Sequence, residues 1–250
     1  MAGKFYAIKE GFDSSNNVKV ENKIVTTWDE CLKYVKGVKG AVYKSFKSID
    51  EAKSFIDNTN QTVSKASASY PDDCMHIYVD GSYNISTNRY AYAFVVVLND
   101  VVIHIENGSA KSDDKNNIRQ IAGELEASVR GLEFALSQGA KKVAIFHDYL
   151  GIAHHATGFW SRREESSINY YNKMQEMMKK GIEVIFVKVD SHTGDLYNEL
   201  ADEKCKEILG ISSDNVVRKH LKNNTIKVKN EDVKNLISEL APEYKENIIL

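Results

Sequence analysis

The sequence predicts an α/β protein in which a mixed five-stranded sheet flanked by helices follows a small α+β unit. Three observations lead to this prediction. After residue 75, segments with strand-like alternation and segments with a helical repeat follow one another in the order βββαβααβα. A polar stretch, residues 58–74, separates this part from the first 57 residues. The chain contains 42% hydrophobic and 27% charged residues, as globular domains do.

Residues 1–57 are expected to fold as a compact unit of strands and helices. Three segments are typical of strands, namely Lys4–Lys9, Ile24–Thr27 and Gly40–Phe46. The polar, turn-rich segment Gly11–Asn22 is either a loop or an open hairpin. Thr27 and Ser48 each stand three residues before a glutamate, as in a capping box. They indicate helices over residues 28–36 and 48–57.

Residues 58–74 are predicted to be a flexible linker, because the segment is small and polar and offers little to bury. A coil of this length would hold its ends roughly 20–24 Å apart on average. Such a tether raises the local concentration of one unit once the other has bound a shared ligand.

Residues 75–211 are expected to form the larger unit. Its predicted strands are 75–80, 90–98, 101–106, 143–147 and 182–189. Asn99-Asp100 is a two-residue turn of the hairpin type, so the first three strands are expected to be antiparallel. Its predicted helices are 121–138, 149–158, 168–180 and 197–209.

Four acidic residues are placed so that they could share one metal site. Asp80 and Asp148 each end a strand, so their carboxylates project at one edge of the sheet if the two strands are neighbours. Glu124 lies in the first turns of one helix, and Asp202 lies within the last helix. Four carboxylates in one place would repel one another without a divalent cation. An oxygen-only set favours magnesium, with manganese as the second candidate.

Other metal chemistry and a membrane location are not indicated. The three cysteines, Cys31, Cys74 and Cys205, are far apart and lack the spacing of a zinc site, so reduced thiols are expected. The N-terminus has no apolar signal segment, and no apolar run approaches the ~20 residues of a membrane span. We therefore expect a cytoplasmic protein with no membrane partner.

Four motifs of the larger unit resemble the catalytic domain of type 1 ribonucleases H. They are Tyr78-Val79-Asp80-Gly81-Ser82, Gly123-Glu124-Leu125-Glu126-Ala127, Phe146-His147-Asp148-Tyr149, and the stretch from Ser191 to Asp202. The last motif is the most specific, because His192 precedes Asp202 by ten residues, as in that family. The resemblance covers about residues 75–210 and implies a ribonuclease H-like sheet.

This resemblance implies an endonuclease that hydrolyses the RNA strand of RNA–DNA hybrids with two metal ions and leaves 5′-phosphate and 3′-hydroxyl ends. Asp80 would bridge both ions, Glu124 and Asp148 would complete one shell, and Asp202 would join Asp80 on the other ion. His192 would assist product departure or proton transfer. The candidates for substrate contacts are Ser82, Asn84, Gln120 and Asn198. Asn198 could instead simply cap the last helix.

Residues 3–57 resemble the hybrid-binding domain, related to caulimovirus viroplasmin, that precedes many type 1 ribonucleases H. The resemblance is carried by Phe5–Lys9, Thr27–Cys31 and Gly40–Phe46. It implies that Trp28 and Tyr43 stack on the DNA strand and that Lys44 holds the hybrid. Tyr6 is a third aromatic candidate, although packing in the core is the alternative for each of these rings. Double-stranded RNA is a second expected ligand of this domain.

Two other functions fit the sequence less well. An exonuclease of the same fold needs a second acid two residues after Asp80, where this chain has Ser82. A non-catalytic hybrid-binding protein with a degenerate nuclease domain would have no need of the four intact acids.

Residues 212–250 lie beyond the resemblance and are predicted to be a helical extension, because Val233, Leu236 and Ile237 form an apolar stripe. A monomer is expected.

Overall fold

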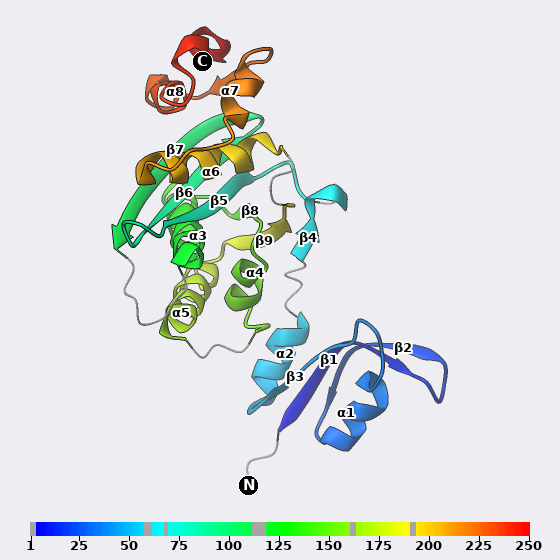
Figure 1. Cartoon of the computed structure of the whole chain (residues 1–250). Coiled ribbons are helices and arrows are strands. Elements are labelled where there is room, and N and C mark those ends of the chain that lie inside the picture. Colours follow the sequence, from blue (N-terminus) through cyan, green and yellow to red (C-terminus); the bar gives the residue numbers. More distant parts are fainter. Residues whose placement is uncertain (1–3, 58–61, 68–69, 112–118, 161–163, 191–193) are drawn as a thin grey trace. The chain divides into compact units, whose positions relative to one another are not determined.

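The computed structural model describes residues 4–57, 62–67, 70–111, 119–160, 164–190 and 194–250. The chain divides into two compact units (Figure 1). The first contains residues 1–61 together with 157–161, and the second contains residues 62–156 and 162–250. No helix among the described residues has the length and apolar character that crossing a membrane requires.

The first unit is built on a three-stranded antiparallel sheet in the order β2-β1-β3. Its strands are β1 (Phe5–Asp13), β2 (Val18–Val25) and β3 (Val42–Phe46), and its helices are α1 (Trp28–Val35) and α2 (Ile49–Asp57). Ile8 of β1 packs with α1, whereas its neighbour Ala7 packs with α2. Adjacent strand residues face opposite sides of a sheet, so the two helices cover opposite faces.

The sequence left two alternatives for Gly11–Asn22, a loop and an open hairpin, and the structure contains the hairpin. β1 and β2 pair as far as Asp13 and Val18, next to the turn. The Asp13 side chain accepts hydrogen bonds from the backbone N–H groups of Ser15 (3.0 Å) and Asn16 (3.3 Å). An aspartate in this role stabilises a tight turn.

The second unit is built on an eight-stranded sheet in the order β11-β10-β7-β6-β5-β8-β9-β4. Its five central strands are β5 (Met75–Asn84), β6 (Arg89–Leu98), β7 (Val101–Lys111), β8 (Lys142–His147) and β9 (Glu183–Lys188). The first three are antiparallel, and β8 and β9 run parallel to β5. The predicted mixed five-stranded sheet is therefore confirmed, and further strands extend both of its edges.

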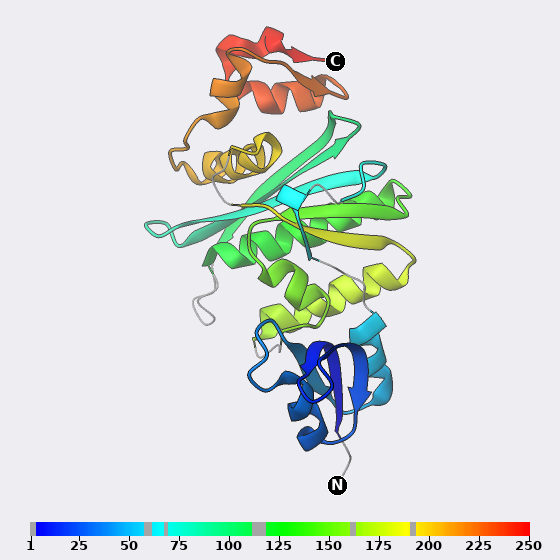
Figure 2. The same cartoon turned by 90° about the vertical axis from the view of Figure 1, so that its right-hand side faces the viewer.

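Helices cover both faces of this sheet (Figure 2). They are α3 (Arg119–Ser137), α4 (Gly151–Ala156), α5 (Glu165–Lys179) and α6 (Leu196–Leu209). Ile77 and Val79 of β5 share a core cluster with residues of α3, α4 and α5. Tyr78, which lies between them in the sequence, shares a second cluster with Leu200 of α6. α6 thus lies on the face opposite α3.

The prediction of a flexible linker over residues 58–74 is wrong for its second part. β4 (Thr62–Ser64) pairs in parallel with β9, and a short 3-10 helix, η1 (Lys65–Ser67), follows it. The ring of Tyr70 packs edge-on against Phe146 at 5.1 Å between centroids, and Cys74 is buried. Polar residues could join the sheet because an edge strand is held through backbone hydrogen bonds, which need no apolar side chains.

The extension over residues 212–250 contains strands as well as the predicted helices. Its elements are α7 (Val216–Leu221), β10 (Ile226–Val228), α8 (Glu231–Ser238), the 3-10 helix η2 (Pro242–Asn247) and β11 (Ile248–Ile249). β10 pairs with β7, so the extension continues the sheet of the second unit. Strands of two or three residues are too short to show alternation, which is why the sequence indicated helices alone.

Candidate active site

A contact between two glycines brings α3 onto β5. A Cβ atom on Gly81 would overlap the carbonyl oxygen of Gln120 and the backbone nitrogen of Glu124. A Cβ atom on Gly123 would overlap the carbonyl oxygen of Ala91 and approach Gly81 Cα to 2.9 Å. Only glycine permits so close an approach of helix and strand. The contact places Glu124 beside the residue that precedes Gly81, Asp80.

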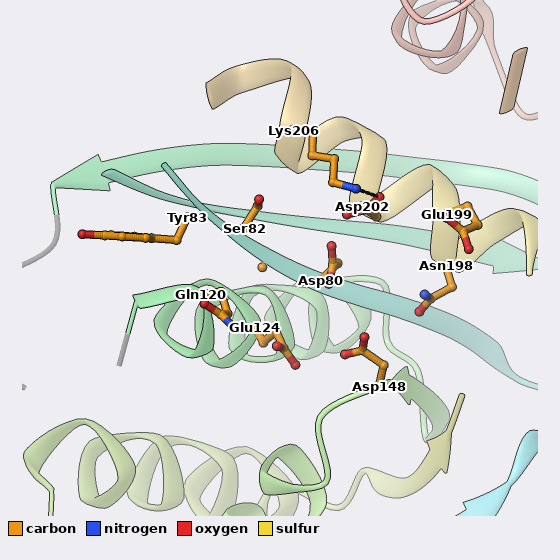
Figure 3. A pocket seen from close by; sticks show the side chains of 11 residues that line it. Asp80, Ser82, Tyr83, Gln120, Glu124, Asp148, Asn198, Glu199, Asp202 and Lys206 are labelled. Carbon is orange, nitrogen blue, oxygen red and sulfur yellow. Dashed lines mark hydrogen bonds and ion pairs between the residues drawn. The ribbon is translucent and has the colours of Figure 1, made fainter. Parts of the chain in front are cut away.

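Strand register places Asp148 at the same edge. β5 and β8 are parallel neighbours, with Tyr78 opposite Phe146. Asp80 and Asp148 each stand two residues beyond that pair, so both carboxylates lie where the two strands diverge. Figure 3 shows the carboxylates of Glu124 and Asp148 pointing toward one another below Asp80. α6 contributes Asp202 from the other face of the sheet.

These side chains line one open pocket of about 310 Å³. One oxygen each from Asp80, Glu124 and Asp148 lies within 4.8 Å of the other two. Asp80 and Glu124 are almost fully buried, with 8% and 5% of their surface exposed. Asp202 lines the same pocket but is not part of this closest group. The predicted convergence of the four acids is thus observed.

Burial and mutual repulsion raise the pKa values of the two buried carboxylates, Asp80 and Glu124. Burial, reinforced by Asp202, Glu124 and Asp148, raises the pKa of Asp80 well above its usual range. Burial, reinforced by Asp148, raises the pKa of Glu124 to about 9. Glu124 Oε2 is buried and has no hydrogen-bond partner among the described residues. A divalent cation would supply the missing partner and offset the repulsion, so this oxygen-only set fits Mg²⁺ or Mn²⁺.

Lys206 partly neutralises the fourth acid. Its ammonium lies 2.7 Å from Asp202 Oδ2, four residues earlier on α6, and both side chains line the pocket. Lys206 is not among the site residues expected from the sequence, although its spacing of four residues from Asp202 is that of a helical ion pair. Figure 3 shows this pair above the other three acids.

Three of the four predicted substrate-contact residues also line the pocket: Ser82, Gln120 and Asn198. Asn198 Oδ1 is buried without a hydrogen-bond partner among the described residues. Asn84 is used differently. Its amide donates to the carbonyl oxygen of Leu209 (3.1 Å), and its Oδ1 accepts from Ser86 N (2.9 Å). The Asn84 side chain therefore shapes the turn after β5. His192 lies outside the described residues.

The predicted aromatic residues of the first unit form one surface cluster. The Trp28 ring lies 5.6 Å from the Tyr6 ring and 5.9 Å from the Tyr43 ring, measured between centroids. Trp28 is 40% exposed and Tyr43 is 42% exposed. Lys44 follows Tyr43 on β3 and therefore faces the other side of the sheet, where its ammonium donates hydrogen bonds to the carbonyl oxygens of Gly158 and Phe159. Trp28 and Tyr43 therefore present ring surface to solvent, as a stacking platform requires.

Family models match both units of the chain. Residues 4–56 match the model described as the Ribonuclease H1 N-terminal domain, and residues 72–209 match the RNase H model. The second match covers more than half of the 250 residues. The chain belongs to the ribonuclease H family. The acid pocket lies within the matched catalytic domain, and the aromatic cluster lies within the matched N-terminal domain.

Curated relatives match short parts of this ribonuclease H chain. A ribonuclease H of Saccharomyces cerevisiae is 37% identical over 68 residues, which is 27% of this chain and 17% of that protein. A ribonuclease H of Crithidia fasciculata is 52% identical over 33 residues, which is 13% of this chain and 7% of that protein. The chain therefore spans less than a fifth of the length of either relative in these matches.

Solved structures of family members are similar over about half of the chain. RNase H1 from the halophilic archaeon Halobacterium salinarum NRC-1 is 19% identical with a TM-score of 0.46, over 54% of this chain and 97% of that one. LC11-RNase H1, solved in complex with an RNA/DNA hybrid, is 18% identical with a TM-score of 0.45, over 54% of this chain and 99% of that one.

Proposed function

We propose that this chain is an endonuclease that hydrolyses the RNA strand of RNA–DNA hybrids. The observation that carries the proposal is the group of buried Asp80, buried Glu124 and half-buried Asp148, with one oxygen from each within 4.8 Å of the other two in an open polar pocket. Membership in the ribonuclease H family supports the choice of reaction. A binding protein would gain nothing from burying carboxylates that repel one another.

Magnesium is the proposed cofactor, with manganese as a substitute, and two ions are proposed for each site. Asp80, Glu124 and Asp148 would hold one ion, and Asp80 and Asp202 would hold the other. When bound, such a pair supplies activation of the attacking water and stabilisation of the leaving 3′-oxygen. The proposed products carry 5′-phosphate and 3′-hydroxyl ends.

The chain's own residues would orient the substrate around these acids. Asn198 Oδ1, which is buried and unpaired among the described residues, offers an acceptor to a 2′-hydroxyl group. The 2′-hydroxyl is the group by which a protein distinguishes RNA from DNA. Ser82 and Gln120 line the same pocket and would hold the backbone of the cleaved strand. His192 would move a proton or assist product departure.

The N-terminal unit is proposed to hold the hybrid. The rings of Trp28 and Tyr43 would stack on the DNA strand, with Tyr6 packed beside Trp28. Because the two units share one chain, binding by the first raises the local concentration of substrate at the second. Double-stranded RNA as a second ligand, a monomeric state and a cytoplasmic location stay predictions from the sequence.

A panel of duplexes tests this function. RNA–DNA hybrid, double-stranded RNA and double-stranded DNA of one sequence, each labelled on one strand, are incubated with the protein in Mg²⁺, Mn²⁺ or EDTA. We expect internal cuts in the RNA strand of the hybrid, only with a metal present. Binding of the hybrid without cleavage under every metal condition would contradict the proposal and favour the non-catalytic alternative.

A further inference from the structure

A lysine that follows β4 contacts the helix that carries Asp202. The ammonium of Lys65 forms an ion pair with Asp195 Oδ2. It also donates a hydrogen bond of 3.2 Å to the hydroxyl group of Tyr78. The same ammonium lies 4.9 Å from the centroid of the Tyr78 ring and 5.1 Å from that of Phe146. The Lys65 ammonium thus contacts a carboxylate, a hydroxyl group and two aromatic rings of the second unit.

Asp195 has a second role as the N-cap of α6. Its other oxygen, Oδ1, accepts a hydrogen bond of 3.4 Å from the backbone N–H of Asn198. The two oxygens of one carboxylate therefore join Lys65 to the first turn of the helix. Only 12% of the Asp195 side chain is exposed, so solvent can replace the lysine only in part.

The first turn of α6 leads directly into the acid pocket. Asn198 lies one turn after the cap, and Asp202 lies one turn further on. Lys65 itself does not line this pocket. A change at Lys65 therefore reaches the reacting groups indirectly, through Asp195 and the helix or through Tyr78 and Phe146 on the strands that lead to Asp80 and Asp148.

We propose that Lys65 is a positioning residue for the hydrolytic site. It holds Asp195, and through Asp195 it fixes the first turn of α6 so that the Asn198 side chain faces the acid pocket. The kinetic part of its test rests on the proposed function, whereas the contact itself exists in the metal-free chain. Residues 62–67 thus contribute to the active site without touching the substrate.

Three variants of the full chain test this role. Lys65→Met removes the charge while keeping a long side chain, and Lys65→Arg keeps the charge. Lys142→Met is the matched control, because it removes another ion pair of the segment before β5, 3.0 Å long, between Lys142 Nζ and Asp73 Oδ1. Neither residue of that pair lies on α6. Thermal unfolding of each variant establishes that it is folded.

We expect Lys65→Met to lower kcat for hybrid cleavage by about five- to twentyfold, because small displacements of catalytic groups are costly. KM should change less than kcat does, because Lys65 itself does not bind the hybrid and the N-terminal unit, which is proposed to hold the hybrid, is unchanged. Lys65→Arg should restore at least about half of kcat, and Lys142→Met should match the native chain. In the metal-free protein, hydrogen exchange of the peptide covering residues 195–202 should be several-fold faster in Lys65→Met alone.

The proposal would be overturned if folded Lys65→Met had the same hydrogen exchange rate over residues 195–202 and the same kcat as the unmodified chain. Faster exchange without a change in kcat would also overturn it, as would a higher KM with unchanged kcat, which would show direct contact with the hybrid. If the native chain does not cleave hybrids, the proposed function fails on its own. Hydrogen exchange then still decides whether Lys65 fixes the helix.

Discussion

At the scale of one residue, Glu124 shows that a carboxyl group placed for metal binding lowers the stability of the metal-free fold. Its side chain is 5% exposed, it faces Asp148, and its Oε2 lacks a partner among the described residues. Burial and the neighbouring acid raise its pKa to about 9. In the metal-free folded chain Glu124 therefore keeps its proton at neutral pH, whereas in the unfolded chain it is ionised.

This difference predicts a pH-dependent gain in stability for Glu124→Gln. As pH rises above the normal pKa of glutamate, Glu124 of the unmodified chain loses its proton in the unfolded state before it does so in the folded state. The free energy of unfolding of the unmodified chain therefore falls until pH reaches about 9. Glutamine does not titrate. In EDTA at pH 7, the free energy of unfolding of the variant should exceed that of the native chain by about 1–3 kcal/mol.

Urea unfolding in EDTA at pH 5 and pH 8 measures this effect. The advantage of Glu124→Gln should be larger at pH 8. Glu133→Gln, an exposed position on the same helix, serves as the control and should show no such trend. If Glu124→Gln raised the free energy of unfolding equally at both pH values, the raised pKa of Glu124 in the folded chain would be contradicted.

At the scale of elements, the site depends on how closely α3 approaches β5. Gly123 lies against Ala91 and Gly81, and a methyl group there has no room because the overlapping atoms are backbone atoms. Gly123→Ala should therefore push α3 away from β5 and lower the free energy of unfolding by about 1–3 kcal/mol.

Because Glu124 follows directly, Gly123→Ala should also reduce hybrid cleavage by more than about tenfold. Unfolding and cleavage assays on the same preparation measure both effects, with Glu133→Ala as the control on the exposed face of α3. Native activity in Gly123→Ala would show that the glycine contact does not set the position of Glu124.

The C-terminal extension is joined to α6 by two residues that directly follow Asp202. Glu203 Oε1 accepts hydrogen bonds from the backbone N–H groups of Val216 and Val217, at 2.5 and 3.3 Å. Lys204, with 1% of its side chain exposed, lies 2.8 Å from Glu239 Oε2 and donates to the Leu236 carbonyl oxygen at 3.1 Å. Residues 212–250 are thus part of the core of the second unit.

Removing this buried lysine should destabilise the second unit. Lys204→Met leaves Glu239 without its cation and the Leu236 carbonyl without its donor. Because Glu239 is partly exposed, we expect a loss of about 1–3 kcal/mol in the free energy of unfolding, measured with urea. Lys222→Met, at an exposed position of the extension, should change it by less than about 0.5 kcal/mol. Equal losses in the two variants would contradict a stabilising role for the Lys204 contacts.

At the scale of the whole molecule, the two units are expected to divide binding and cleavage. Trp28→Ala removes the central ring of the aromatic cluster. Since stacking contributes about 1–3 kcal/mol per base, the Kd for hybrid should rise about tenfold or more. The kcat at saturating hybrid should stay within about twofold of the native value, because the acid pocket is unchanged.

Fluorescence anisotropy with labelled hybrid in EDTA measures this Kd. Ile49→Ala is the matched control, because Ile49 is a similarly exposed apolar residue of the same unit, outside the aromatic cluster. A Kd that is unchanged in Trp28→Ala, or raised equally in Ile49→Ala, would argue against a stacking platform.

The sequence predicted the parts of this molecule that leave a local pattern. The alternation in β5 to β9, the stripe of α3 and the spacing of His192 from Asp202 led to the central sheet and to the four acids. β4, β10 and β11 were missed, because two or three residues held by backbone hydrogen bonds need no apolar pattern.

The contacts of Lys65 and Lys204 could not be predicted either. Lys65 meets Asp195 across 130 positions, and Lys204 meets Glu239 across 35 positions. Nothing in the local sequence distinguishes these lysines from solvated ones, because only the tertiary fold brings their partners near. The hydrogen bond from Asn84 to the Leu209 carbonyl oxygen was hidden for the same reason, since Leu209 lies on α6.

The central claim is that the buried acids form a metal-dependent nuclease site. Its most direct test compares Asp148→Asn with Asp73→Asn, an exposed acid of the same unit that lies outside the pocket. Cleavage of the RNA strand of a uniform hybrid is measured in Mg²⁺. We predict that Asp148→Asn loses at least about a hundredfold in rate while remaining folded, and that Asp73→Asn retains native activity. Equal cleavage by both variants would contradict the assignment of the acid pocket as the active site.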